Sequence, residues 1–214
     1  MRTSNTWWPL ADLRILAGDL TLRPLTEGDL APLADHLPAD VELNPALPAY
    51  DGIDASVARG IALHQTYWRA LGNWRVESWD LLFAVLYDGE VIGVQSLEGS
   101  DFPRRRTVET WSFLLPAARG CGYGKSMRRA VLALAFDHLG ALAAETEALQ
   151  GNAASLGVSR AVGYLPNGET LHPHGDGVDV MVRMRLTRER WLASGMFPTV
   201  DITGFDACRH LFGG

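Results

Sequence analysis

The chain has 214 residues, of which 47% are hydrophobic and 21% charged, and its formal net charge is −6. This length suits one domain, or a domain with an appendage, that buries roughly 70–75% of its unfolded surface, and the apolar runs are too short to cross a bilayer. The negative charge argues against a nucleic-acid partner and favours a cationic one, such as an amine.

The N-terminal part predicts a lead-in, a strand and a helix. Residues 1–18 form an aromatic lead-in that lacks the apolar segment of a signal peptide, so we expect a cytoplasmic protein. Alternating apolar residues predict a strand over 20–25, and Thr26 begins a helix that runs to about Leu37. Three prolines between positions 38 and 50 then predict a loop.

A second helix is predicted from Asp54, which can cap it, to about Leu71. His64 and Trp68 lie on the apolar face of this helix because they share its helical spacing. The ordinary interpretation of His64 is that it is a packed, hydrogen-bonded core residue.

The stretch from 81 to 115 predicts three consecutive strands. Strands over 81–87 and 90–97 flank Asp88-Gly89, which is the strongest short hairpin signal. A loop over 98–106 follows, and a strand over 107–115 comes next.

A glycine-rich turn follows the third of these strands. Residues 118–126 read Ala-Arg-Gly-Cys-Gly-Tyr-Gly-Lys-Ser, and a helical pattern runs over 125–139. The glycines permit backbone conformations closed to other residues, and the helix start offers free N–H groups and a positive dipole end, so an anion such as phosphate is expected here. The turn does not match a Walker A motif, because position 119 is an arginine, nor the dinucleotide fingerprint, whose third glycine would fall on Lys125 or Met127.

The C-terminal part predicts a strand over 142–149 that carries Glu145 and Glu147. Their period of two puts both carboxylates on one face of the strand, where acids are unusual unless solvated or functional. Asn152 opens a helix, and strands over 164–172 and 178–186, a short helix from 187 and a tail over 195–214 follow. His172 and His174 lack further ligands, so no metal site is expected.

Two motifs resemble the GNAT superfamily of acyl-CoA-dependent N-acyltransferases. The run Arg119-Gly120-Cys121-Gly122-Tyr123-Gly124 is similar to its pyrophosphate loop, Q/R-x-x-G-x-G/A. The stretch from Asn152 to Gly163-Tyr164 resembles its second signature, an Asn that opens a helix ending in Gly-aromatic. The opening strand and Asp29-Leu30 are similar to the branch with the ribosomal-protein N-alpha-acetyltransferases, above all its actinobacterial members, some of which use succinyl-CoA.

The resemblance implies a single α/β (α+β) domain over 1–214 with the GNAT fold. That fold has a central mixed, mostly antiparallel, twisted sheet of about seven strands, flanked by helices, with a splayed strand pair that holds CoA. Loop amides would bind the pyrophosphate of acetyl-CoA or succinyl-CoA, and the backbone of 113–115 would pair with the pantetheine arm. The residues expected to bind CoA are Phe113, Leu114, Leu115, Arg119, Gly120, Cys121, Gly122, Tyr123, Gly124, Lys125, Ser126, Asn152 and Ser155.

The resemblance also suggests the catalytic groups. Glu147 stands five residues before Asn152, the offset of the glutamate base in N-terminal acetyltransferases of the superfamily; the alternative is a solvated acid that only attracts a cation. Where the superfamily often has a tyrosine acid, this chain has Ser159, and Ser155 one turn earlier is an alternative donor. Residues expected near the acceptor are Glu145, His64, Trp68 and Trp111.

These observations predict direct attack of a primary amine, on a protein N-terminus, a lysine or a small molecule, on an acyl-CoA thioester. No covalent intermediate on Cys121 is expected. A non-catalytic acyl-CoA-binding or assembly module is the first alternative, and a P-loop-like nucleotide enzyme, disfavoured by Arg119, is the second. A succinyl group would need a cation, which 104–106 or Arg160 could supply. The apolar chain ends hint at a homodimer, and neither nucleic acid nor a membrane is expected as a partner.

Overall fold

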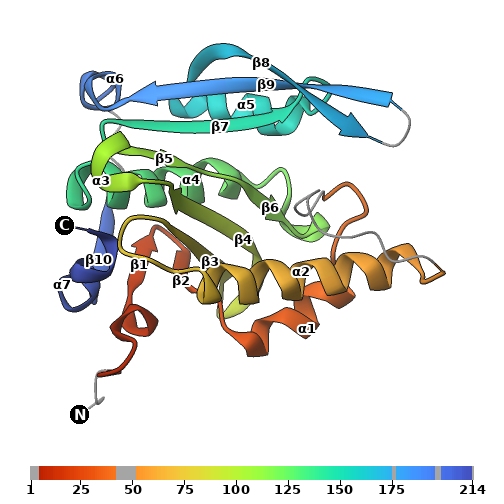
Figure 1. Ribbon diagram of the computed structural model, residues 1–214, viewed down its shortest axis with the longest axis horizontal. Helices are drawn as coiled ribbons and strands as arrows, with labels where there is room; N and C mark the ends of the chain where they lie inside the picture. The colour runs from red at the N-terminus through yellow and green to blue at the C-terminus, as the bar shows by residue number, and fades with distance from the viewer. Residues whose placement is uncertain (1–4, 42–51, 175–176, 196–198, 214) are drawn as a thin grey trace.

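The computed structural model describes residues 5–41, 52–174, 177–195 and 199–213, without the side chains of 173 and 174. One ten-stranded sheet runs in the order β10-β1-β2-β3-β4-β5-β7-β9-β8, and β6 joins it by pairing with β4 (Figure 1). Its strands are β1 (Arg14–Ala17), β2 (Leu20–Pro24), β3 (Trp79–Tyr87), β4 (Glu90–Gly99), β5 (Thr107–Glu109), β6 (Ser112–Leu114), β7 (Ala143–Leu149), β8 (Leu165–His174), β9 (Gly177–Thr187) and β10 (Val200–Thr203). The helices are α1 (Glu27–Asp35), α2 (Ala55–Gly72), α3 (Phe102–Arg105), α4 (Tyr123–Ala133), α5 (Ala153–Val162), α6 (Arg188–Ala193) and α7 (Phe205–Cys208).

The prediction of a mixed, mostly antiparallel sheet flanked by helices is confirmed, since only β5 and β7 run parallel. The sheet has three strands more than the seven predicted. The lead-in supplies β1, which pairs with β2 and with β10 from the tail. The third extra strand arises because the predicted strand over 107–115 breaks at Thr110 and Trp111 into β5 and β6. Side chains still alternate across this break, so the sequence pattern does not reveal it.

Local signals place most of the elements well. Asp88 and Gly89 have φ angles of 50° and 82°, as the predicted tight hairpin between β3 and β4 requires. The structure begins α5 directly after Asn152 and ends it at Gly163, whose φ of 106° suits a helix C-terminus. Residues 42–50 of the predicted proline loop lie outside the described part of the chain.

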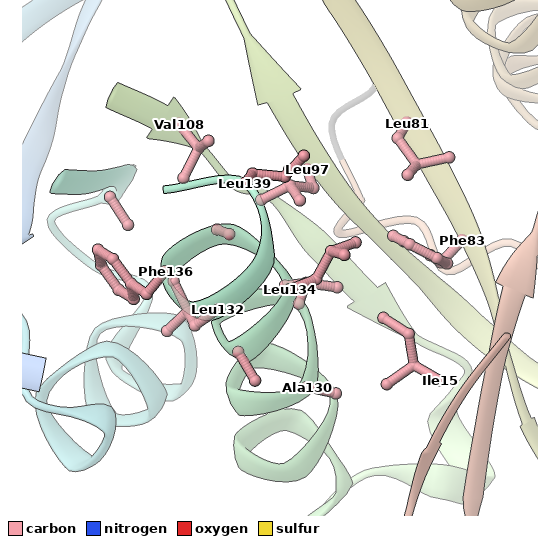
Figure 2. Packing of buried hydrophobic residues seen from close by; sticks show 14 of the residues in the cluster. Ile15, Leu81, Phe83, Leu97, Val108, Ala130, Leu132, Leu134, Phe136 and Leu139 are labelled. Atoms are coloured by element: carbon pink, nitrogen blue, oxygen red, sulfur yellow. The ribbon is translucent and has the colours of Figure 1, made fainter. Parts of the chain in front are cut away.

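One face of the sheet is covered by α4, the π-helical turn Leu134–His138 and α5, and we call it the α4 face. Figure 2 shows side chains of this helical segment, such as Leu134, lying against strand residues such as Phe83 and Leu97. These three side chains are fully buried. Apolar burial of this kind is the main term that stabilises the fold.

The opposite face is covered by α1 and α2, which pack against each other, and we call it the α1–α2 face. Its apolar cluster is smaller: Leu30, Leu33 and Leu63 from the helices meet Val94 and Phe113 from the strands. Asp54 caps α2 by accepting a hydrogen bond from Ser56 N.

The aromatic lead-in and the apolar tail pack mainly within the chain. The ring centroids of Trp8 and Trp74 lie 5.5 Å apart, and the same distance separates Trp74 from Phe212. Phe205 and Phe212 are buried, whereas Trp7 is 93% exposed. Core packing therefore accounts for most of the apolar side chains that hinted at a dimer.

The sheet divides into a fork where β5 gives way to β6. The parallel pairing of β5 with β7 ends at Glu109 and Glu145. Beyond that point β6 pairs with β4, while residues 146–149 of β7 pair with β9. We call the space between β6 and residues 146–149 the fork; it is the splayed strand pair that the resemblance predicts.

Candidate functional site

The glycine turn lies between β6 and α4, after a short 3-10 turn at Pro116–Ala118. Gly120 and Gly122 have φ angles of 78° and 87°, a backbone region that side chains disfavour, although a Cβ there would meet no atom within 4 Å. Gly122 is the N-cap of α4, no side chain caps the helix, and its first turn carries no acid. The geometry therefore fits an anion held by backbone N–H groups.

The beginning of α4 is fixed by contacts on two sides. A Cβ on Gly124 would stand 3.2 Å from Val158 on α5, so the glycine allows the two helices to approach closely. The ring of Tyr123 lies 5.1 Å from that of Tyr87 on β3. Among the other predicted loop residues, Cys121 and Lys125 are exposed and Ser126 is half-buried.

Arg119, predicted as a side-chain partner of the pyrophosphate, has other partners here. Its two terminal nitrogens donate to the carboxylate of Asp40 at 2.8 and 2.9 Å, and Nε donates to the carbonyl of Leu114 at 3.0 Å. The hydrogen bonds from Arg119 hold the pKa of Asp40 below its ordinary value. Arg119 therefore ties the glycine turn to the end of β6.

The predicted backbone at 113–115 forms one arm of the fork. Phe113 and Leu114 pair with β4, and Leu115 N donates to Ile92 O. A Cβ on Gly93 would stand 2.3 Å from the Phe113 carbonyl, so only glycine permits this close strand approach. Because β6 pairs only with β4, its other edge faces the fork and can pair with an extended ligand.

The helix α5 presents the predicted polar residues near the other arm. The side-chain oxygen of Asn152 accepts from Ser155 N at 3.0 Å, so Asn152 is an N-cap. Ser159 is buried, and its hydroxyl donates to the carbonyl of Ser155 at 3.1 Å. Ser155 itself is half-buried. The hydroxyl proton of Ser159 is thus directed at its own helix.

Four carboxylates form a row across the α1–α2 face, which we call the acidic row. Asp80 on β3 pairs with Glu98 on β4, Glu98 with Glu109 on β5, and Glu109 with Glu145 on β7. Residues paired directly across strands project from the same face of a sheet. Sequence reasoning missed Asp80 and Glu98, because only the strand pairing brings these acids together.

Asp80, Glu98 and Glu109 line a cavity of about 190 Å³ beside the end of α2. Burial, reinforced by the charge of Asp80, raises the pKa of Glu98 to about 7. Burial also raises the pKa of Asp80, and Arg69 opposes this. Asp80 and Glu98 are half-buried, and adjacent carboxylates of this kind are stabilised by a proton or by a bound cation.

The predicted pair Glu145 and Glu147 lies on the same face of β7, with different surroundings. Glu145 is buried and forms ion pairs with Arg185 at 2.6 Å and Arg183 at 3.3 Å. Glu147 is exposed and accepts a hydrogen bond from Thr170 Oγ1 at 3.3 Å. The charge of Glu145 is therefore balanced inside the protein, and that of Glu147 is open to a ligand.

The predicted acceptor-side residues divide between α2 and the fork. The His64 ring nitrogen Nδ1 is 2.8 Å from the Gly60 carbonyl, and its ring lies 5.6 Å from that of Trp68, which is 51% exposed. Trp111 is half-buried and packs on the apolar cluster of the α1–α2 face.

The described residues contain neither a metal-binding cluster nor a helix suited to a membrane. No group of three His, Cys, Asp or Glu side chains is arranged to hold a metal ion; the side chain of His174 lies outside this part. No helix there combines the length and hydrophobicity that a bilayer-spanning segment needs.

Comparison with known proteins agrees with this geometry. The sequence model of the family described as "Acetyltransferase (GNAT) domain" matches residues 19–165. The fold is similar to that of spermidine N-acetyltransferase from Vibrio cholerae, solved in complex with CoA and spermine, with a TM-score of 0.60 and 19% identity over 81% of this chain and 98% of that chain. It is also similar to an acetyltransferase of the GNAT family from Bacillus anthracis, with a TM-score of 0.63 and 16% identity over 82% of this chain and 99% of that chain.

Proposed function

Because this chain belongs to the GNAT acetyltransferase family, we propose that it transfers an acetyl group from acetyl-CoA to a primary amine on a molecule that carries a second positive charge. The second positive charge of the acceptor is inferred from Asp80 and Glu98, which line the cavity on the α1–α2 face. A cation bound there would offset the repulsion between these two half-buried carboxylates. The spermine-bound neighbour, similar in fold, supports a polyamine as the first acceptor to test.

The residues of the glycine turn fit the pyrophosphate of CoA. The positive φ angles of Gly120 and Gly122 and the uncapped start of α4 suit an anion held by the backbone N–H groups of 120–124, whereas Lys125 N and Ser126 N donate to Gly122 O. The free edge of β6 at residues 113–115 would hold the pantetheine arm, and the N-cap Asn152 borders the other arm of the fork. When bound, acetyl-CoA supplies the thioester that the amine attacks, and CoA is the leaving group.

We propose Glu147 as the base that takes the proton of the attacking amine, because it is exposed on the α1–α2 face of β7. Glu98 is the second candidate, since a carboxyl group with a pKa of about 7 suits proton transfer at neutral pH. A base contributes roughly 10²–10⁴-fold in rate. Ser155 remains the candidate proton donor on α5, because the hydroxyl of Ser159 is engaged by the helix.

The finer assignments also remain proposals. A protein N-terminus, as in the ribosomal-protein branch, and succinyl-CoA as the donor are the alternatives to a polyamine and acetyl-CoA. Arg160 is exposed and could meet a succinyl carboxylate. We further propose that the whole chain acts as one cytoplasmic domain, and gel filtration at several concentrations would test the homodimer.

The first experiment measures the melting temperature with CoA, acetyl-CoA, succinyl-CoA and ATP in turn. A ligand at about 100 times its Kd adds roughly 2.7 kcal/mol to the free energy of unfolding. We expect stabilisation by the CoA compounds and none by ATP. Stabilisation by ATP alone would support the nucleotide enzyme and overturn the proposal.

The second experiment compares acceptors and variants. Spermidine, a monoamine and a short peptide with a free N-terminus are tested with wild type and with Asp80→Asn/Glu98→Gln. We expect the double variant to raise KM for spermidine at least tenfold and to leave KM for the monoamine nearly unchanged. Equal effects on both would remove the cavity from recognition. Glu147→Gln should lower kcat while CoA still binds; if no amine is acetylated at all, the acyl-CoA-binding module becomes the better description.

A further inference from the structure

A buried charge on the α4 face lies directly below the fork. Arg128 on α4 is 2% exposed. Its three guanidinium nitrogens donate to Gln95 Oε1 at 3.4 Å, Thr146 Oγ1 at 3.3 Å and Ser112 Oγ at 3.2 Å, and all of these acceptors are uncharged. No carboxylate among the described residues forms an ion pair with Arg128. Burying a charge without a counter-charge is costly, so its presence calls for an explanation.

The contacts of Arg128 join the two arms of the fork at the point where they separate. Ser112 is the first residue of β6, and Thr146 is the first residue of β7 beyond the pairing with β5. The hydroxyl of Thr146 donates its own proton to Thr110 O at 2.7 Å. Figure 1 shows α4 passing behind this part of the sheet. Arg128 therefore places its charge beside the inner end of the fork.

The hydroxyl of Ser112 differs from that of Thr146. It accepts from Arg128, and the structure shows no acceptor for its proton among the described residues. A hydroxyl that accepts from a guanidinium is polarised and becomes a better donor. Ser112 can thus donate toward an atom held in the fork.

We propose, on the basis of the proposed function, that Arg128 is a positioning residue that polarises Ser112 and supplies the positive charge that stabilises the CoA thiolate as it leaves. In that reaction the amine nitrogen forms a bond to the acyl carbon, and the carbon–sulfur bond breaks. The sulfur keeps the electron pair, and the amine proton passes to the base. No cation-bearing side chain other than Arg128 contacts both arms of the fork among the described residues. In this role Arg128 and Ser112 replace the proton donor expected at Ser159, whose hydroxyl donates to Ser155 O on α5 instead.

Arg128→Met is the main variant, because methionine has a similar length and no charge. Removing the buried guanidinium relieves its desolvation cost but leaves Gln95 Oε1 and Ser112 Oγ without this donor, and the two effects oppose each other. We expect a melting temperature within a few degrees of that of wild type, with kcat at least tenfold lower and KM for the amine nearly unchanged. Arg128→Lys keeps the charge and should recover a large part of kcat. Arg129→Met is the matched control, since Arg129 neighbours it on α4 but donates to Ala161 O on α5.

A direct readout is the ionisation of the CoA thiol in the complex, followed by thiolate absorbance. An opposite charge at close range lowers a pKa by about 1–3 units. We expect the thiol to ionise at least one pH unit higher in Arg128→Met than in wild type, which is tenfold less thiolate. Ser112→Ala should give a smaller change in the same direction.

The other charged groups near the fork are not substituted in the Arg128 and Ser112 variants. Glu98 on β4 and the pair Glu145 and Glu147 on β7 project from the α1–α2 face. Lys125 at the start of α4 and Arg160 on α5 are exposed. Tyr164, whose pKa is raised by burial, lies on the α4 side, with its hydroxyl 3.4 Å from that of Thr110. A shift seen only in the Arg128 and Ser112 variants therefore reports on that pair.

Two results would overturn the inference while leaving the proposed function intact. One is a CoA thiol whose ionisation is the same in Arg128→Met and wild type. The other is a fall of several degrees in melting temperature with no recovery in Arg128→Lys, which would make Arg128 only a structural bridge between strands. Failure of wild type to bind CoA would instead contradict the proposed function.

Discussion

The two faces of the sheet use charge in opposite ways. The α4 face buries a large apolar cluster around one guanidinium, that of Arg128. The α1–α2 face has a smaller apolar cluster and carries the acidic row beside a cavity. A positive charge on one side of the fork suits a departing thiolate, and negative charge on the other side suits an amine. If the proposed function holds, the two faces of the sheet would separate the chemistry of the acyl donor from that of the amine acceptor.

The largest expected single effect is on core stability. Leu134 on the α4 face and Leu33 on the α1–α2 face are both at most 1% exposed. Leu134 is enclosed by strands and helices, so Leu134→Ala should lower the free energy of unfolding by about 4 kcal/mol. Leu33 has exposed neighbours on α1 that can relax, so Leu33→Ala should cost about 2.5 kcal/mol. Urea denaturation with unchanged m-values tests this; an equal or larger cost for Leu33→Ala would contradict the contrast.

The next largest effect is the change with pH in the free energy of unfolding that Glu98 causes. Its folded pKa of about 7 exceeds the ordinary value of 4.5, so between these values the folded protein keeps a proton that the unfolded chain has lost. The free energy of unfolding therefore falls as the pH rises from 4.5, by about 3 kcal/mol in full above pH 7. Glu98→Gln should remove this slope. Denaturation at pH 5 and pH 8 checks it, and a variant with the slope of wild type would show that Glu98 is not its source.

The same charge predicts that a cationic acceptor binds more tightly as the pH rises. The acceptor amine replaces the proton of Glu98, so affinity for spermidine should increase between pH 5.5 and pH 8 in wild type and much less in Glu98→Gln. Calorimetric titration with CoA already bound measures this difference.

A smaller effect is expected on CoA affinity when a glycine of the glycine turn, rather than one elsewhere, is replaced. Gly122 has a φ of 87°, which valine disfavours, so Gly122→Val should lower the free energy of unfolding by about 1–3 kcal/mol and weaken CoA binding at least tenfold. Gly18 is the control, because it has a φ of 59° in the β1–β2 turn and its Cβ would also meet no atom within 4 Å. Gly18→Val should lose similar stability and keep CoA affinity. Equal CoA affinity in both variants would exclude the turn from the cofactor site.

The features that sequence predicts well are local ones. The Asp88-Gly89 hairpin, the Asn152 cap and the glycine turn each depend on the conformation of a few neighbouring residues. Backbone preferences of this kind act within one turn or hairpin, so residue order alone carries them. Most helices and strands were accordingly predicted in kind and in approximate position.

The features that the sequence did not predict depend on contacts between residues that are far apart in the chain. Glu98 and Glu109 become neighbours only through the register of β4 with β5. Arg128 is one of three basic residues on α4, and its burial follows from which helix face meets the sheet. The partner of Arg119 is Asp40, 79 residues earlier in the chain. No short-range pattern encodes these contacts, because tertiary packing decides them.

The smallest expected effect concerns the ion pair between Arg119 and Asp40. Arg119 and Asp40 have side chains 41% and 64% exposed, so Asp40→Asn should change the free energy of unfolding by less than about 1 kcal/mol. It also removes a negative charge beside the glycine turn and releases Arg119, so CoA affinity should rise about two- to fivefold, equal to about 0.4–1 kcal/mol. Asp206→Asn, which breaks the exposed pair with Arg209, is the control and should leave CoA affinity unchanged. Weaker CoA binding in Asp40→Asn would mean that the pair holds the turn in its binding shape, and Arg119 would then serve the turn rather than the phosphate.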